Sequence, residues 1–178
     1  MDIVVTDYDS TWPEQAAQAR ARLTDALPGL FLEIEHVGST SVPGLAAKPI
    51  IDLMASVPSL DAVTPAHETA LADEGFHAAD SGMTDRLFYV RHDGAGRRSH
   101  HLHVVDADTW DTRNERLFRD HLRAHPDVAA EYGALKQRLA AEVRDPDTYT
   151  RRKTDLVQRV VDRERTARGL PLEDVWEE

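Results

Sequence analysis

The residue types best suited to chemistry gather in residues 36–53, which begin with the small-residue run Gly38-Ser39-Thr40. A glycine lets the backbone approach a ligand closely, while hydroxyl groups and the amide groups at the start of a helix bind anionic oxygens. We therefore expect Gly38, Ser39 and Thr40 to form a cradle for phosphate. Lys48 follows in the same stretch and can contact a phosphate as a point charge, unless it is a solvated loop lysine.

Asp52 interrupts an apolar run of strand length, Pro49–Ala55. An ionised carboxylate is costly to bury unless a cation or a hydrogen-bonded base offsets its charge. The apolar run continues through Leu53 to Ala55, whereas an acid that only caps a loop belongs at the end of a strand. We expect Asp52 to bind a cation or a base; the alternative is a cap on the following loop.

His101 and His103 are two residues apart in a predicted strand, so both side chains point to the same face of the sheet. Two imidazoles and the carboxylate of Asp52 form a reasonable ligand set for a divalent cation. We predict that Asp52 binds Mg²⁺ or Mn²⁺ with His101, His103 or both, and histidine ligation favours manganese. In the alternative, one histidine is a buried, hydrogen-bonded strand residue and the other lies in solvent.

Strands are expected to position these residues. Alternating apolar and polar residues over 31–37 predict a strand that ends at Gly38, and the apolar run 49–55 predicts a second strand. Three further strands are predicted over Phe76–Asp80, Arg86–His92 and His100–Asp106. Residues 93–99 are expected to form a hairpin loop, and a short strand is expected over Ile3–Thr6.

Helices account for the rest of the predicted fold. One follows Pro13 and stops at Pro28-Gly29, and a second runs from Thr64-Pro65 to near Gly75. From Trp110 onward, apolar residues recur at helical spacing in two stripes, and a third helix starts at Asp145-Pro146. The expected class is α+β, a mixed sheet with flanking helices and a C-terminal group of three helices, followed by an acidic tail that frays or docks loosely.

Composition narrows the class of protein. The 178 residues suffice for a single domain with its own core, and there are no cysteines, which excludes disulfides and thiolate metal sites. We find no secretory or membrane-spanning segment and expect a cytoplasmic protein. The formal net charge of -11 opposes binding to nucleic acid or to an anionic membrane.

The Gly38-Ser39 pair, the twelve residues that follow it and then Asp52 resemble the signature of the nucleotidyltransferase superfamily. More narrowly, residues 36–53 resemble the GrpB (UPF0157) family within that superfamily. Further matches to the family are Tyr8-Asp-Ser-Thr-Trp-Pro13, His101-Leu-His-Val104, Phe118-Arg-Asp-His-Leu-Arg123, Tyr132 with Lys136, and Tyr149 with Lys153. The resemblance implies a nucleotidyltransferase-like fold that binds a nucleoside triphosphate at the Gly-Ser loop and a metal at Asp52.

Tyr149 and Lys153 are four residues apart in the last predicted helix, so their side chains emerge on one face near its N-terminal end. Lys153 lies at the edge of the apolar stripe, where a lysine can pack its stem on the core and send its ammonium toward a cleft. Because both residues match the family, we expect them to contact the base, sugar or outer phosphate of the ligand. The alternative is an edge pair whose stems only pack.

The resemblance leaves open whether the protein is an enzyme. The superfamily generally holds its metal with two or three carboxylates, but the residue two positions after Asp52 is Met54, and a thioether is a poor ligand for a hard cation. One hypothesis is a metal-dependent nucleotidyltransferase-like protein that transfers a nucleotidyl group to an unknown acceptor. The other is a noncatalytic nucleotide-binding, regulatory or chaperone-like module that resembles the extension of dephospho-coenzyme A kinases, and Met54 favours it.

Overall fold

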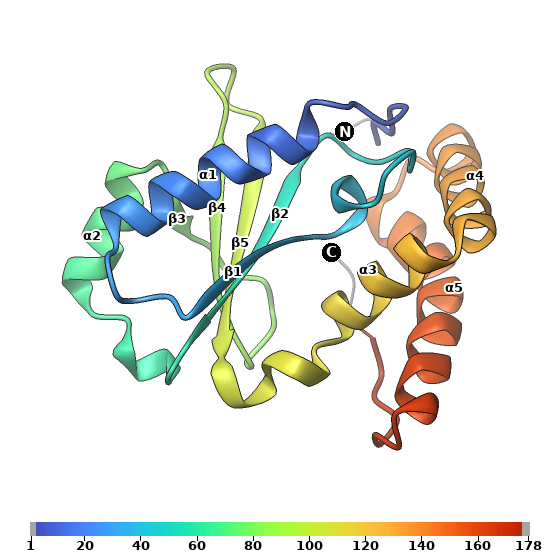
Figure 1. The fold of residues 1–178 in the computed structure, drawn as a ribbon. Coiled ribbons are helices and arrows are strands. Elements are labelled where there is room, and N and C mark those ends of the chain that lie inside the picture. The colour runs from blue at the N-terminus through green and yellow to red at the C-terminus, as the bar shows by residue number, and fades with distance from the viewer. Residues whose placement is uncertain (1–2, 176–178) are drawn as a thin grey trace.

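A five-stranded sheet forms the centre of the computed structural model, which describes residues 3–175 (Figure 1). The strands are β1 (Glu33–Val37), β2 (Ile51–Val57), β3 (His77–Ala78), β4 (Leu87–His92) and β5 (Arg98–Asp106). Their order across the sheet is β1-β2-β5-β4-β3. Only the β2–β5 pair is parallel and the other three pairs are antiparallel, so the sheet is mixed as predicted.

Helices lie on both sides of the sheet (Figure 1). The helices α1 (Trp12–Ala26) and α2 (Pro65–Asp73) cover one side, and α3 (Asn114–Ala124), α4 (Pro126–Glu142) and α5 (Pro146–Ala167) form a group beside the β1–β2 connection. Three short 3-10 turns, η1 (Ser39–Ser41), η2 (Leu60–Ala62) and η3 (Ala107–Thr112), complete the elements. The predicted α+β class with three C-terminal helices is therefore confirmed. No helix in the described part of the chain combines the length and apolar character needed to cross a lipid bilayer.

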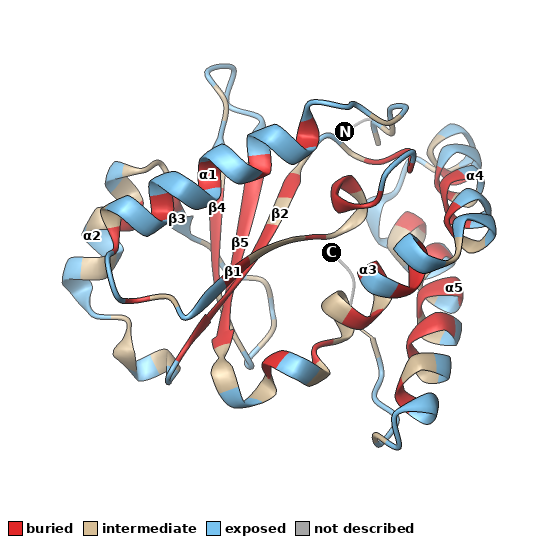
Figure 2. Cartoon of the chain, viewed as in Figure 1, coloured by how far each residue is buried: buried red, intermediate tan, exposed pale blue. Residues whose placement is uncertain are grey.

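The main core lies between α1, α2 and the two central strands, where the sheet is buried (Figure 2). Its members from α1, β2 and β5 include Trp12, Ala16, Ala19, Leu23, Leu53, Ala55, Leu102 and Val104. The α1 residues repeat every three or four positions, so they share one helix face, and the strand residues alternate and so share one sheet face. This core fixes β2 and β5 side by side and thereby fixes the residues on their opposite face.

A second core joins the C-terminal helices to the β1–β2 connection. Val42 and Leu45 of the connection pack with Leu122 of α3 and with residues of α4 and α5. Val175 of the tail packs against the same cluster, and its backbone N–H donates a 2.8 Å hydrogen bond to Gln158. The connection that carries the Gly-Ser loop is therefore held between the sheet and the helices, and the described part of the tail is docked.

Three local predictions differ from the structure. Ile3–Thr6 is not a strand in the described residues; only Thr6 pairs, in an isolated bridge with Ala47 of the β1–β2 connection. The predicted strand Phe76–Asp80 shortens to β3: Phe76 is buried in the core before the strand, and Ala79 keeps one hydrogen bond to Phe88 before the chain leaves the sheet at the exposed Asp80. Trp110 lies in η3 rather than in an α-helix, where its ring packs on Val37.

Candidate functional site

A cleft of about 470 Å³ lies between the sheet and the C-terminal helices. Its lining includes all nine residues singled out in the sequence: Gly38, Ser39, Thr40, Lys48, Asp52, His101, His103, Tyr149 and Lys153. They come from four separate parts of the chain, namely the β1–β2 connection, β2, β5 and α5. The fold therefore brings the whole predicted set to one place.

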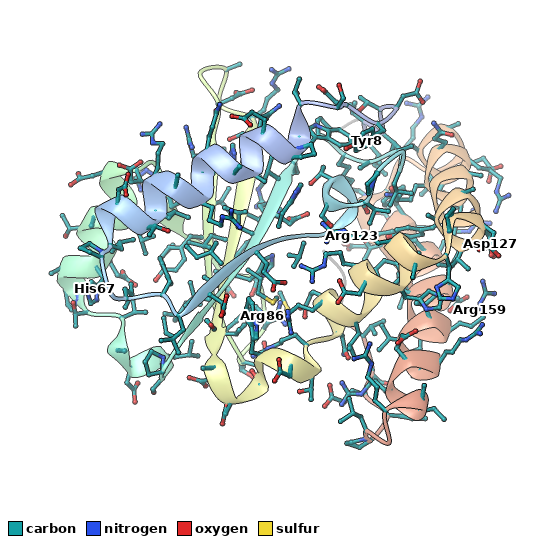
Figure 3. All side chains as sticks on the ribbon, viewed as in Figure 1. Tyr8, His67, Arg86, Arg123, Asp127 and Arg159 are labelled. Atoms are coloured by element: carbon teal, nitrogen blue, oxygen red, sulfur yellow. The ribbon has the colours of Figure 1, made fainter. Side chains whose placement is uncertain are left out.

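Arginines of α3 hold the Gly-Ser loop in position. Arg123 donates a 3.0 Å hydrogen bond to the carbonyl of Ser41, and Arg119 donates a 3.1 Å bond to the carbonyl of His36 while it pairs with Glu35. Figure 3 shows Arg123 between α3 and this loop. These bonds tie both ends of the loop to one helix, so its backbone is presented to the cleft in a fixed conformation.

Gly38 is required by its own backbone and by its neighbour. Its φ of 71° lies in the left-handed region, and a Cβ there would lie 2.9 Å from the Cβ of Asp52 and overlap the carboxylate.

The hydroxyl of Thr40 already has hydrogen-bond partners, because it donates to the carbonyl of Ile50 and contacts Nε2 of His36 at 2.8 Å. Ser39 lies partly exposed in the cleft wall. The cradle therefore offers the Ser39 hydroxyl and the backbone, but not the Thr40 hydroxyl.

Asp52 lies inside β2 and opposite His101 of the parallel strand β5. Its Oδ1 is 3.1 Å from Nδ1 of His101, so the carboxylate binds a base and does not cap a loop. Burial would raise the pKa of Asp52, but the hydrogen bond to His101 and the nearby His103 and His36 outweigh it and hold the pKa below its ordinary value. Asp52 is thus ionised at neutral pH, and 26% of its side chain is open to the cleft.

His101 and His103 are both buried, which contradicts the alternative that one of them lies in solvent. Burial lowers the pKa of His103 to about 4, helped by the charge of Arg86, so its imidazole is neutral at pH 7. Nδ1 of His103 lies 3.3 Å from Nη1 of Arg86. Nε2 of His101 is buried and has no hydrogen-bond partner among the described residues.

The residues at this end of the cleft fit a divalent cation. One ligand atom from each of Asp52, His101 and His103 lies within 4.8 Å of the others. Oδ1 of Asp52 and Nδ1 of His101 are 3.1 Å apart, which is close to the spacing of about 3.0 Å between adjacent ligands at about 2.1 Å from a six-coordinate ion, so a cation bound there would replace the hydrogen bond between them. Met54 takes no part, because its fully buried side chain packs with Val105 and Trp110.

The other end of the cleft is formed by lysines and tyrosines. Lys48 and Lys153 both lie over the ring of Tyr149, with Nζ at 4.9 and 5.5 Å from its centre, and Lys136 lies 4.5 Å from the centre of the Tyr132 ring. Both tyrosines are buried, and so is Lys153, which was expected at the edge of the apolar stripe. These three lysines are the only ones in the chain, and all of them line the cleft.

Sequence reasoning did not select four lining residues that the geometry makes prominent: Arg86, Glu115, Tyr132 and Lys136. Tyr132 and Lys136 carried a signal, because they match the family and because lysine is rare in this chain. Arg86 and Glu115 carried none, since arginine and glutamate are common here and only the fold brings them together.

Several known proteins are similar to most of the length of this chain. A family model described as GrpB protein matches residues 2–163. A UPF0157 protein of Pseudomonas aeruginosa is 40% identical over 182 residues, which cover 96% of this chain and 71% of that protein. A UPF0157 protein of Bacillus subtilis is 36% identical over 135 residues, but these residues span only 39% of its length. A dephospho-CoA kinase of Mycolicibacterium paratuberculosis is 31% identical over 170 residues, covering 79% of this chain and 40% of the kinase.

Solved structures give the same family and a wider fold relationship. The crystal structure of the conserved protein GrpB from Enterococcus faecalis has a TM-score of 0.82 and 31% identity, and the match covers 93% of this chain and 99% of that one. A cytoplasmic RNA terminal U-transferase has a TM-score of 0.51 and 13% identity over 76% of this chain and 41% of its own. At that identity the likeness shows the nucleotidyltransferase-like fold alone. The sequence and structural matches together show that this chain belongs to the GrpB family.

Proposed function

We propose that the chain binds a nucleoside triphosphate in the cleft and, with a divalent cation, transfers its nucleotidyl group to an acceptor. The observation that carries this proposal is the meeting of all three lysines of an acidic chain in the cleft that holds the Gly-Ser loop and Asp52. Three ammonium groups supply positive charge for a triphosphate in a chain whose formal net charge is -11.

Each part of the cleft has a distinct task in this proposal. The backbone at Gly38 and the hydroxyl of Ser39 hold phosphate oxygens, while Lys48 and Lys153 offset the charge of the outer phosphates. Tyr149 holds both ammonium groups in place through its ring face. Asp52 and His101 would hold the cation, which would supply positive charge to offset that of the transferred phosphoryl centre.

Calorimetric titration of the four nucleoside triphosphates, each with and without Mn²⁺, tests the proposal. We expect binding that strengthens when Mn²⁺ is present and that loses this enhancement in Asp52→Asn, because the amide cannot offset the charge of the ion. Release of pyrophosphate from the bound nucleotide then measures transfer to water or to a trial acceptor. Absence of nucleotide binding under every condition would contradict the proposal.

A noncatalytic nucleotide-binding module is the second candidate. Two observations favour it: Met54 is a core residue where a second carboxylate would be expected, and the chain is similar to part of a dephospho-CoA kinase. Such a module would bind the triphosphate in the same cleft but would leave it intact. Tight nucleotide binding without pyrophosphate release across a panel of alcohol, amine and phosphate acceptors would favour this candidate.

A further inference from the structure

Arg86 is a buried cation in the wall of the cleft, beside the proposed metal ligands. Only 7% of its side chain is exposed. Its Nη1 lies 2.5 Å from a carboxylate oxygen of Glu115 and 3.3 Å from Nδ1 of His103, and its Nε lies 2.9 Å from Asp85. A carboxylate and an imidazole therefore converge on one nitrogen of the guanidinium, as they would converge on a bound cation.

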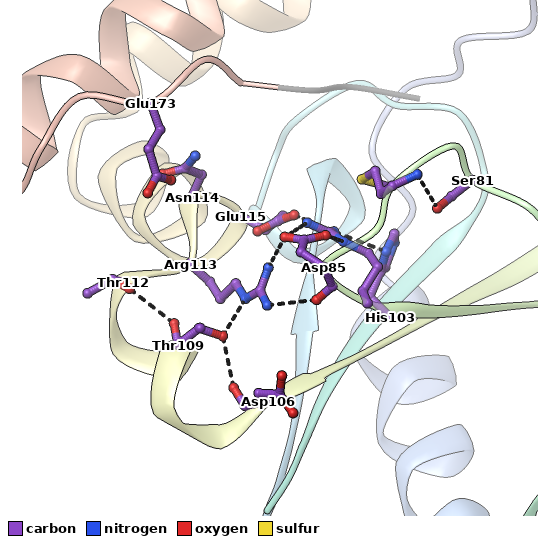
Figure 4. A network of polar contacts seen from close by, with 12 residues as sticks. Ser81, Asp85, His103, Asp106, Thr109, Thr112, Arg113, Asn114, Glu115 and Glu173 are labelled. Carbon is purple, nitrogen blue, oxygen red and sulfur yellow. Dashed lines mark hydrogen bonds and ion pairs between the residues drawn. The ribbon is translucent and has the colours of Figure 1, made fainter. Parts of the chain in front are cut away.

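The loop that carries Arg86 is fastened to the start of α3. Asp85 pairs with both Arg86 and Arg113. Arg113 also donates to the backbone carbonyl of Asp85 and, at 3.0 Å, to the hydroxyl of Thr109 (Figure 4). Figure 3 shows Arg86 between the sheet and α3. The guanidinium is thus held in place from both sides and is not a mobile surface group.

The contact with Arg86 decides the hydrogen-bonding role of Nδ1 of His103. An arginine only donates hydrogen bonds, so Nδ1 of His103 accepts from Arg86 and its lone pair is engaged. Nδ1 of His103 is then unsuited to bind a metal ion while Arg86 is in place. The carboxylate of Glu115 is likewise engaged, by its ion pair with Arg86.

We propose that Arg86 is a fixed cation that occupies the place between His103 and Glu115 where a second divalent ion would otherwise bind. The chain accordingly takes a single divalent ion, at Asp52 and His101. This inference deepens the proposed function and rests on its metal site, but it concerns what Arg86 excludes and can be tested without nucleotide. Arg86 acts as a positioning residue, because it determines which side chains remain open to an ion.

Calorimetric titration of Mn²⁺ alone measures the number of ions bound. We expect one ion in the wild type, one in Glu115→Gln and none in Asp52→Asn. Arg86→Met should bind two ions. Without the guanidinium, the carboxylate of Glu115 and the imidazole of His103 lose their shared partner and can both bind a second ion. Arg86→Lys keeps the positive charge and should bind one, and the double variant Arg86→Met, Glu115→Gln should return to one.

Several outcomes would overturn the inference. Two ions in the wild type, or loss of the single ion in Glu115→Gln, would show that Glu115 is a ligand despite Arg86. A folded Arg86→Met variant, judged by circular dichroism, that binds no more ions than the wild type would show that Arg86 excludes nothing. If Arg86→Met does not fold, the Glu115→Gln titration still decides the inference. A wild type without ions and an Arg86→Met variant with one Glu115-dependent ion would support the role of Arg86 and refute the Asp52 metal site separately.

Discussion

The two ends of the cleft differ in the side chains that contact their charged groups. At the acid end, each carboxylate has a basic partner from the chain itself: Asp52 has His101, and both Glu115 and Asp85 have Arg86. At the lysine end, the ammonium groups of Lys48, Lys136 and Lys153 lie against the ring faces of Tyr132 and Tyr149. A ring face attracts a cation by its quadrupole, whereas a carboxylate is paired here with a basic side chain.

The two ends of the cleft are therefore suited to different ligands, a cation at one end and an anion at the other. The acid end is neutralised internally except where Asp52 opens to the cleft, so it has room for one small cation. The lysine end gathers all three lysines of the chain, so it is suited to an anion with several charges. The comparison therefore predicts that metal binding and nucleotide binding respond to different substitutions, and the following predictions test that separation.

The largest expected effect is at the acid end, in Gly38→Ala. A Cβ at this position would overlap the Asp52 carboxylate, so the side chain must shift away from His101. Misplaced metal ligands typically cost about 10- to 100-fold in affinity, and we expect Mn²⁺ binding to fall by that amount. Gly29→Ala is the matched control, because Gly29 has a similar φ of 78° but open space around its Cβ. Equal Mn²⁺ affinity in the two variants, measured by calorimetry, would contradict this account of Gly38.

A smaller effect is expected at the lysine end, in Lys153→Met, which keeps most of the stem and removes the charge. Loss of one charge-assisted contact with a phosphate costs about 1.5 to 3 kcal/mol, which is roughly a tenfold or larger loss of nucleotide affinity. The affinity for Mn²⁺ alone should stay unchanged. Arg152→Met in the same helix is the control, since its side chain is 55% exposed. An equal loss of nucleotide affinity in both variants would mean that general charge, and not the position of Lys153, attracts the ligand.

The sequence allowed the strands and helices to be predicted because their periodicities are local properties. The role of Asp52 could also be predicted, since a charged residue in an apolar run needs a partner. The two-residue spacing of His101 and His103 likewise predicted that they share a face of the sheet. The sequence did not show that β2 and β5 are neighbours in the sheet, which places Asp52 opposite His101. That pairing depends on the packing of the whole sheet against α1, and no local pattern encodes it.

Arg86 and Lys136 illustrate the limit for single residues. Arg86 is the first residue of a predicted strand and directly precedes β4, and nothing in that position indicates its ion pair with Glu115 at the start of α3. Lys136 adjoins the apolar stripe of α4, where a long side chain usually points to solvent, yet it is buried beside Tyr132. In both cases the burial of charge is a tertiary property, so only the three-dimensional arrangement identifies the residue.

The smallest expected effect concerns the stability that internal pairing gives to the acid end. Burial would raise the pKa of Asp85, but its bonds to Arg86 and Arg113 prevail and lower the pKa from 3.8 to about 2. Between these two values the unfolded chain binds a proton that the folded chain does not, so the free energy of unfolding falls as the pH falls through this window. At neutral pH the contribution is fully present.

Asp85→Asn should therefore lower the free energy of unfolding at pH 7 and flatten its dependence on pH between about 4 and 2. The side chain of Asp85 is 53% exposed and water screens the pairs, so we expect a loss of about 1 kcal/mol or less. Urea unfolding at a series of pH values measures both quantities. Asp111→Asn is the control, since 95% of that side chain is exposed. An Asp85→Asn variant with the same slope as the wild type in this window would show that the acid end is held by packing and not by its arginine pairs.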